Sequence, residues 1–422
     1  MNDVAADAAK QAVERVFSEH WGRLLALLTG QLRSLEIAEE SLADAFEQAV
    51  RHWERDGVPD RPKAWLLTTA RRRGLDRLRR EATLARKLPL LVVDTEPERG
   101  ADAALVGEEA DAAAIPDERL RLLFTCCHPA LASEARVALT LRMVGGLTTA
   151  EIARAFLVSE PTMAARITRA KKKVATAGIP YRVPTDADLP DRLGGVLAVL
   201  YLVFTEGHSA TSGASPVRAA LCEEAIRLTR VVSDLLPTEP EPAALLALML
   251  LHHSRRDART DDEGQLVLLA DQDRSRWNRA EIEEGVAFVE HAASFRRVSA
   301  YLLQAAIAAE HASARSAAET DWAAIVALYE RLERLTGSPV VRLNRAVAVA
   351  EREGPDRGFA LLAGLDEVLG DYQPLRLARA DFLRRMGERA AARLEYARAR
   401  DLAGNDAERA FLSRRLAELD AD

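Results

Sequence analysis

Residues 147–173 limit most strongly what this chain can fold into, because they read as two short helices joined by a tight turn. Thr148 and Glu151 have the spacing of a capping box at the start of the first helix. Ser159 can cap the second helix, with Pro161 in its first turn, where a missing N–H costs no hydrogen bond. The spacing therefore predicts a helix-turn-helix.

The second of these helices has an apolar side and a basic side. The apolar residues recur at the spacing of one helical face: Met163, Ile167, Ala170 and Val174. The candidates for contacts with DNA lie on the other side or next to it: Ser159, Thr162, Arg166, Arg169, Lys171, Lys172 and Lys173. An apolar back that docks on its own domain and a basic front that meets phosphates and base edges favour DNA binding. A helical hairpin with a solvated basic face is the alternative.

Charge is distributed unevenly along the chain, although the formal net charge is only −7. Residues 61–87 hold ten Lys or Arg against two Asp or Glu, whereas residues 94–118 hold nine Asp or Glu against one Arg. Any nucleic-acid binding must therefore be local. Because the chain has 422 residues, few aromatics and abundant Ala, Leu, Arg and Glu, we expect several domains that are helical nearly throughout.

Helical periodicity divides the first part of the chain into three blocks. The first block, residues 10–88, predicts three helices: 12–28, 37–53 and 63–84. Residues 89–114 are acidic, rich in alanine and without an apolar stripe, which predicts a flexible linker. Residues 115–177 predict three or four helices and include the helix-turn-helix.

The third helix of the first block is a second basic element. The residues that can pack inward are Trp65, Leu66, Ala70 and Leu78. The basic side chains that project outward are Lys63, Arg71, Arg72, Arg73, Arg77 and Arg80. Such a helix can follow a phosphate backbone or hold a single strand, and a solvated basic face is the alternative. Asp76 is expected to pair with a neighbouring arginine.

The rest of the chain is helical again, and a weak repeat occurs near its end. Arg342–Ala346 aligns with Arg376–Ala380, 34 residues later, and Gly354 aligns with Gly387. A helix–turn–helix period near 34 residues is typical of tetratricopeptide repeats. The spacing predicts such a region at about 320–415, with an irregular helical bundle as the alternative.

The sequence gives no sign of a catalytic residue, a metal site or a cofactor. Adjacent side chains such as Cys127 and His128 point about 100° apart on a helix, so they do not form a catalytic dyad. The pair His252 and His253 lies in an apolar helix without a metal-binding pattern and predicts packed or surface histidines. The glycine loop of a phosphate-binding enzyme is also missing. We therefore do not expect an enzyme.

The location of the protein follows from similar reasoning. Three cysteines without a C-x-x-C pattern favour a reducing cytoplasm. No secretory signal and no apolar run long enough to span a membrane occur, so no membrane partner is expected. Glu206–His208 follows an apolar helix and predicts a helix end before a polar loop, with a contact to a partner or to the helix-turn-helix domain as the alternative.

Over residues 10–177, two basic elements joined by an acidic linker resemble the extracytoplasmic-function sigma factors of bacterial RNA polymerase. Residues 38–46 resemble the family's clamp-binding helix, and residues 63–79 resemble the helix that reads the −10 element. Residues 147–173 resemble the −35-binding part of sigma domain 4. Residues 181–422 are similar to the C-terminal extension of one subgroup, whose members carry tetratricopeptide-like helices.

The resemblance implies an all-α, cytoplasmic initiation factor that binds promoter DNA and core RNA polymerase, at its clamp and flap regions. Sigma domain 2 would occupy residues 10–88 and sigma domain 4 residues 115–177, with the linker passing through the channels of the polymerase. The extension would regulate access to polymerase or bind a protein partner. The residues that would contact the clamp are Glu40, Asp44, Glu47 and Gln48. The family often has a pair of acids or glutamines where this chain has Ala43 and Asp44.

The alternative is a helix-turn-helix transcription regulator with a protein-binding helical-repeat scaffold that does not join polymerase. Such a regulator usually dimerises on a palindrome with half-sites one helical turn apart. The helix at residues 38–50 favours the sigma factor, because a regulator of that kind has no use for a clamp-binding helix.

Overall fold

The structure is a computed structural model. It describes residues 2–87, 114–156, 158–185, 187–208, 219–261, 265–404 and 406–421. The described residues are helical apart from turns and one isolated bridge, which confirms the expected all-α fold class. They form two compact units, Met1–Val199 and Leu200–Asp422, and the boundary falls inside helix α8 (Leu189–His208). No helix in the described residues has the length and apolarity needed to cross a membrane.

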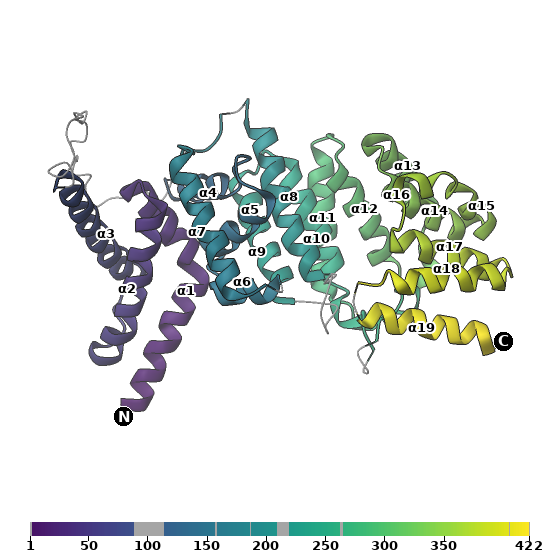
Figure 1. Ribbon diagram of the computed structural model, residues 1–422, viewed down its shortest axis with the longest axis horizontal. Helices are drawn as coiled ribbons and strands as arrows, with labels where there is room; N and C mark the ends of the chain where they lie inside the picture. The colour runs from purple at the N-terminus through teal and green to yellow at the C-terminus, as the bar shows by residue number, and fades with distance from the viewer. Residues whose placement is uncertain are drawn as a thin grey trace. The chain divides into compact units, whose positions relative to one another are not determined.

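Unit 1 begins with three long helices that pack side by side (Figure 1): α1 (Asn2–Leu32), α2 (Leu35–Asp56) and α3 (Pro62–Lys87). The three predicted helices are confirmed, and each extends beyond its predicted bounds. Helix α2 starts at Ser34, whose Oγ accepts a hydrogen bond from the Ile37 N–H at 3.3 Å. The core between α1 and α2 includes the rings of Phe17, Trp21 and Phe46, with centroids 4.9–5.9 Å apart.

Four shorter helices follow in unit 1 before α8: α4 (Ala114–Cys126), α5 (Ser133–Met143), α6 (Thr149–Ala155) and α7 (Glu160–Thr176). They match the three or four helices predicted for residues 115–177. Helix α4 packs on α1, and α7 packs on both α5 and α6. The predicted acidic linker, residues 89–114, lies outside the described residues except for its last one, Ala114.

The first half of unit 2 is organised around a buried helix. Its helices, after the end of α8, are α9 (Ala219–Leu235), α10 (Pro240–His253), α11 (Arg279–Ser294) and α12 (Ala300–Ser313). Helix α10 is apolar on all sides, as expected of a helix that other helices surround, and it packs on α9, α11 and α12. Short 3-10 turns at Arg256–Ala258, Leu269–Asp271, Arg274–Arg276 and Ala317–Glu319 connect these helices.

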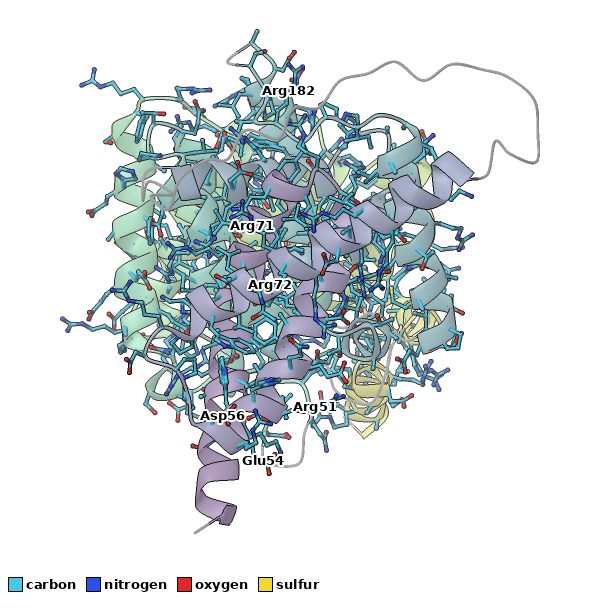
Figure 2. The ribbon with its side chains drawn as sticks, turned by 90° about the vertical axis from the view of Figure 1, so that its left-hand side faces the viewer. Arg51, Glu54, Asp56, Arg71, Arg72 and Arg182 are labelled. Carbon is cyan, nitrogen blue, oxygen red and sulfur yellow. The ribbon has the colours of Figure 1, made fainter. Side chains whose placement is uncertain are left out.

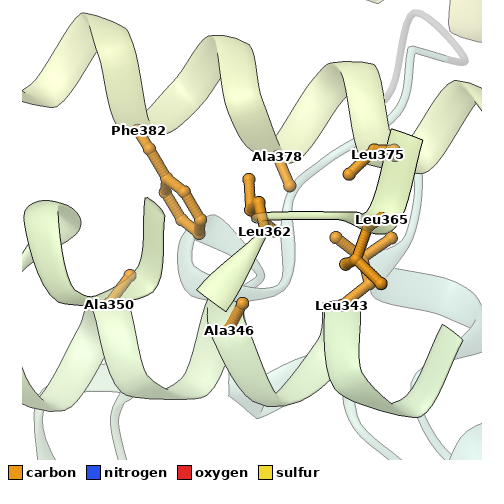
Figure 3. Close-up of a cluster of buried hydrophobic side chains, with 8 residues drawn as sticks. All are labelled: Leu343, Ala346, Ala350, Leu362, Leu365, Leu375, Ala378 and Phe382. Atoms are coloured by element: carbon orange, nitrogen blue, oxygen red, sulfur yellow. The ribbon is translucent and has the colours of Figure 1, made fainter. Parts of the chain in front are cut away.

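The second half of unit 2 continues with paired helices. They are α13 (Trp322–Thr336), α14 (Pro339–Glu353), α15 (Pro355–Leu361), α16 (Leu365–Leu369), α17 (Gln373–Arg385), α18 (Arg389–Asp401) and α19 (Asp406–Ala421). Figure 3 shows one of their cores, in which Phe382 of α17 points toward Ala350 of α14, and Leu362 and Leu365 lie between the two helices. These two helices carry the aligned segments of the predicted repeat.

The glycines of the predicted repeat have a structural role. Gly354 ends α14 with φ 103°, and Gly387 follows α17 with φ 85°. Both values lie in the region that glycine adopts without a steric penalty. The repeat spacing therefore corresponds to helix ends, and the assignment to tetratricopeptide repeats stays a prediction.

Candidate nucleic-acid interface

Both predicted caps of the helix-turn-helix are present. The Thr148 N–H donates to Glu151 Oε2 at 2.7 Å, and the Glu151 N–H donates to Thr148 Oγ1 at 3.2 Å, which completes the capping box. At the start of α7, Ser159 Oγ accepts a hydrogen bond from the Thr162 N–H at 3.3 Å. The two predicted helix starts are therefore confirmed.

Helix α7 is two-sided, as predicted. Its buried residues are Met163, Ile167, Ala170 and Val174. The predicted DNA-contacting residues that are exposed are Ser159, Thr162, Arg169, Lys172 and Lys173. The other two are held by acids: Arg166 Nη2 lies 3.1 Å from Glu134 Oε2, and Lys171 Nζ lies 2.9 Å from Glu39 Oε2. In this conformation the accessible front of α7 therefore consists of the five exposed residues.

Helix α3 lies against α1 and leaves part of its basic face exposed. Leu66 and Ala70 are buried, whereas Trp65 and Leu78 are half-buried. Gly74 allows close contact with α1, because a Cβ at this position would lie 2.3 Å from Cδ1 of a leucine at the end of that helix. The predicted basic residues that are exposed are Lys63, Arg71, Arg72 and Arg80. Figure 2 shows Arg71 and Arg72 on the side of α3 that faces the viewer.

Two arginines of α3 pair with acids of α2. Arg73 Nη1 lies 2.9 Å from Asp44 Oδ2. Arg77 bridges two carboxylates, with Nη1 2.7 Å from Glu40 Oε2 and Nη2 2.9 Å from Asp44 Oδ2. The structure thus joins residues that the sequence analysis assigned to two different partners, DNA and polymerase. Each pair is partly exposed, so its contribution to stability is on the order of 1 kcal/mol or less.

The other two predicted polymerase-contacting residues, Glu47 and Gln48, do not pair with the arginines of α3. Glu47 is exposed and pairs with Arg51 on its own helix, and Gln48 is half-buried. Asp76 of α3 pairs with a neighbouring arginine, as expected, with its Oδ1 3.4 Å from Nη1 of Arg79.

Glu39 of α2 is a central residue of unit 1 that the sequence analysis missed. Its side chain is only 8% exposed and accepts hydrogen bonds from two cations. Arg142 Nε of α5 lies 2.8 Å from Oε1, and Lys171 Nζ of α7 lies 2.9 Å from Oε2. The carboxylate therefore links the first three-helix block to the helix-turn-helix block.

A signal for Glu39 was present in the sequence. Glu39 is the first member of a heptad-like series that continues with Leu42, Phe46, Ala49 and Trp53, all of them buried. An acid in a core position of an otherwise apolar stripe is expected to have a buried cationic partner. The identity of that partner could not be predicted from the spacing.

Further contacts hold the same two blocks together. Arg142 also lies over the ring of Trp21 of α1, with its guanidinium carbon 5.6 Å from the ring centroid. Gly22 of α1 touches the turn before the helix-turn-helix, since a Cβ there would lie 2.4 Å from the carbonyl oxygen of Val144. The Tyr181 hydroxyl lies 2.8 Å from the Ala26 carbonyl oxygen.

Cys127 and His128 each have a local hydrogen-bond partner in the structure. Burial raises the pKa of Cys127 to about 11, although a hydrogen bond with Thr140 lowers it in part, so the thiol stays protonated. His128 Nδ1 accepts a hydrogen bond from the Ala130 N–H. Within the described residues, no three His, Cys, Asp or Glu side chains are grouped as metal ligands would be.

An all-helical unit with a capped helix-turn-helix and a second basic helix is the arrangement expected of a DNA-binding protein. Family models agree with this division. Residues 16–83 match Sigma-70 region 2, and residues 121–174 match Sigma-70, region 4. Residues 192–293 match a family of unknown function (DUF6596).

Curated relatives place the chain more closely. It is 31% identical over 162 residues to ECF RNA polymerase sigma factor SigK of Mycobacterium tuberculosis (strain H37Rv), which covers 37% of this chain and 81% of SigK. The SigK of Mycobacterium ulcerans (strain Agy99) is 29% identical over 149 residues, 34% of this chain and 74% of that protein. Uncharacterized protein R00370 of Rhizobium meliloti (strain 1021) is 44% identical over 398 residues, 94% of this chain and 93% of the relative.

The chain belongs to the ECF sigma factors of RNA polymerase. Sigma-70 domains imply core RNA polymerase and promoter DNA as its partners. The described residues from 189 onward are helical apart from turns and short connections.

Proposed function

We propose that this protein directs transcription initiation through two separate DNA contacts. The proposal rests on one observation above others: α3 and α7 each combine a buried apolar side with an exposed basic side. In α3 the exposed basic residues that we assign to the −10 element are Lys63, Arg71, Arg72 and Arg80. In α7 the exposed residues Thr162, Arg169, Lys172 and Lys173 serve the −35 element.

The two contacts do different work. Opening the −10 element costs unpairing and unstacking energy, about a few kcal/mol for each extruded base. The basic face of α3 offsets this cost by holding the exposed strand. Arg169 of α7 reads a base edge in the −35 element, and a bidentate arginine–guanine pair discriminates by about 1–3 kcal/mol. Lys172 and Lys173 set the register on phosphates.

Docking on core polymerase uses the polar side of α2. Glu47 and Gln48 are accessible without changing α3, whereas Glu40 and Asp44 hold Arg73 and Arg77. We therefore assign the first polymerase contacts to Glu47 and Gln48. Glu40 and Asp44 contact the polymerase once Arg73 and Arg77 leave them and bind DNA.

Promoter binding requires unit 1 to open. The −10 and −35 elements are roughly 25 base pairs apart, on the order of 85 Å at about 3.4 Å per pair. Glu39 and Asp44, five residues apart on α2, contact Lys171 of α7 and Arg77 of α3, so both basic helices meet a stretch of α2 about 7.5 Å long. Such an arrangement cannot reach both elements. About 26 residues separate α3 from α4, and a chain of this length spans at most roughly 90 Å, enough for the open form.

The closed form is the resting state in this proposal. The Glu39 contact keeps sigma domains 2 and 4 together until core polymerase and DNA separate them. The helical extension, residues 181–422, regulates access to polymerase or receives a protein partner, as stacked helical repeats commonly do.

Reconstituted transcription tests the proposal. The full-length protein is incubated with purified core polymerase and genomic DNA fragments, and run-off RNA is mapped. We expect co-purification with core and RNA that starts downstream of paired −10 and −35 elements. Specific DNA binding without core, with no retention on core and no RNA, would favour the helix-turn-helix regulator instead. A second preparation that ends after residue 188 shows whether the extension changes promoter use.

A further inference from the structure

Unit 2 contains a cavity of about 550 Å³ that the proposed role in transcription does not use. Several helices contribute residues to its wall. Among these residues are Tyr201 of α8, His252 of α10, Ile307 of α12, Tyr329 of α13 and Val341 of α14. Cavities of this size bind small organic molecules in many proteins.

Arg255, which follows α10, brings a positive charge to this cavity. Its Nη2 lies 3.3 Å from Nδ1 of His252, and no carboxylate of the described chain pairs with it. Burial lowers the pKa of Arg255 to about 10, with further lowering by Arg259 and Arg274, so the guanidinium is still charged at neutral pH. A cation removed from water without a counter-ion is costly unless something else supplies the negative charge.

The arginines next to Arg255 are satisfied by the chain itself. Arg256 Nη1 donates to the Glu281 carboxylate at 3.0 Å. Arg274 Nη1 donates to the backbone carbonyl of His311 at 2.7 Å, near the C-terminal end of α12, where partial negative charge gathers. Both have a structural explanation in the fold. Arg255 differs from these two arginines because its described partner is a neutral imidazole.

The histidines of the cavity do not add positive charge. Burial is the main cause that lowers the pKa of His252 to about 3 and that of His311 to about 4. Both rings are therefore neutral at physiological pH. No Asp or Glu is among the described residues that line the cavity. One guanidinium charge matches a monoanion better than a phosphate monoester, which carries about −1.5 to −2 at neutral pH.

The remaining wall suits a molecule with an apolar body. Leu251, Leu269, Ile307 and Leu332 are aliphatic lining residues. Burial raises the pKa of Tyr329 to about 12, so its hydroxyl remains a donor. Apolar walls with a few placed polar groups are the usual composition of a small-molecule site.

We infer that this cavity binds an organic acid with one carboxylate and an apolar body, the carboxylate at Arg255 and the body against Leu251, Ile307 and Tyr329. The inference concerns binding in unit 2 and holds whether or not the protein acts with polymerase.

A ligand series tests the inference on the full-length protein. Linear carboxylates from acetate to decanoate, their uncharged amides and hexyl phosphate are titrated, with calorimetry and the melting temperature as readouts. We expect carboxylates of intermediate length to bind and to raise the melting temperature, whereas the matching amides do not. Arg255→Met should weaken carboxylate binding roughly 10- to 100-fold, the usual range for loss of a charge-assisted hydrogen bond. Arg276→Met, a control at an exposed arginine of the same unit, should bind like the wild type.

The ligand-free variants separate a binding role from a structural one. Because Arg255 has no described counter-ion, Arg255→Met should keep or raise the melting temperature without ligand, whereas loss of a structural arginine would lower it. The inference is overturned if no carboxylate of the series binds at millimolar concentration, or if Arg255→Met binds it as well as the wild type. Tighter binding of hexyl phosphate than of hexanoate would overturn the assignment to a monoanion.

Discussion

Replacing Glu39 by glutamine should open unit 1 without removing any residue proposed to touch DNA or polymerase. Glu39→Gln keeps the size and shape of the side chain and removes its charge. The carboxylate now holds Arg142 and Lys171, whose side chains are 19% and 15% exposed. All three groups are largely buried, so solvent and salt screen their attraction only weakly.

The expected size of the effect follows from the two hydrogen bonds at 2.8 and 2.9 Å. A hydrogen bond to a charged group is worth about 1.5–3 kcal/mol, against about 0.5–1.5 kcal/mol for a neutral one. Because a glutamine retains part of the bonding, Glu39→Gln should weaken the closed form by about 1–3 kcal/mol. The ratio of open to closed molecules then rises about 5- to 150-fold.

Two measurements detect this change. Dyes on Leu75→Cys of α3 and Thr168→Cys of α7, both exposed positions, report the separation of the two helices by energy transfer. The native cysteines in the described chain are buried and should react slowly. Affinity for core polymerase should increase in parallel, because the apparent dissociation constant falls as the competent fraction grows.

Glu36→Gln is the matched control. It makes the same charge change on the first turn of the same helix, at an exposed position. If Glu39→Gln leaves both the dye separation and the core affinity at the values of Glu36→Gln, the contact through Glu39 does not hold unit 1 closed. The proposal of a closed resting state would then fail.

Three further outcomes follow from the local structure. Thr148→Ala should cost about 1 kcal/mol through loss of the cap of α6, seen as a lower melting temperature, and an unchanged value would refute the capping role. Arg169→Ala should relax base preference at one −35 position by about 1–3 kcal/mol. Lys172→Ala should instead weaken binding to all DNA sequences alike and reduce the dependence of affinity on salt concentration by about one ion. If both variants weakened binding to all sequences equally, the division of roles between the two residues would be contradicted. His311, whose pKa is held at about 4 by burial and nearby arginines, should make folding less stable as pH falls from about 6.5 to about 4, because only the unfolded chain then takes up the proton. The slope is up to about 1.4 kcal/mol per pH unit, and urea titrations should show a weaker acid dependence for His311→Gln.

The sequence predicted what depends on nearby residues. The capping box of Thr148 and Glu151 and the buried stripe of α7 follow from spacings of three or four residues, which fix hydrogen bonds and helix faces locally. For the same reason the pair of Asp76 and Arg79 was predictable. His253 is packed, as expected for a histidine of an apolar helix, with Glu281 at 3.2 Å.

The contacts between distant segments were not predictable. Glu39 meets Arg142 and Lys171 across 103 and 132 residues of sequence. No periodicity in the sequence shows which of the many Lys and Arg side chains pairs with this buried acid. The same applies to the cavity around Arg255, because its wall comes from helices that are more than a hundred residues apart.

The acids of α2 explain why exposed charge alone gives an incomplete description of the DNA-facing surface. Asp44 holds Arg73 and Arg77, and Glu39 holds Lys171, so three of the basic residues predicted to contact DNA are neutralised inside unit 1. Removing Asp44 would therefore release Arg73 and Arg77 to DNA and change a surface proposed for polymerase at once. Loss of transcription in such a variant has two explanations that cannot be told apart by activity. Glu39 avoids this ambiguity, because it is buried and no polymerase contact is assigned to it.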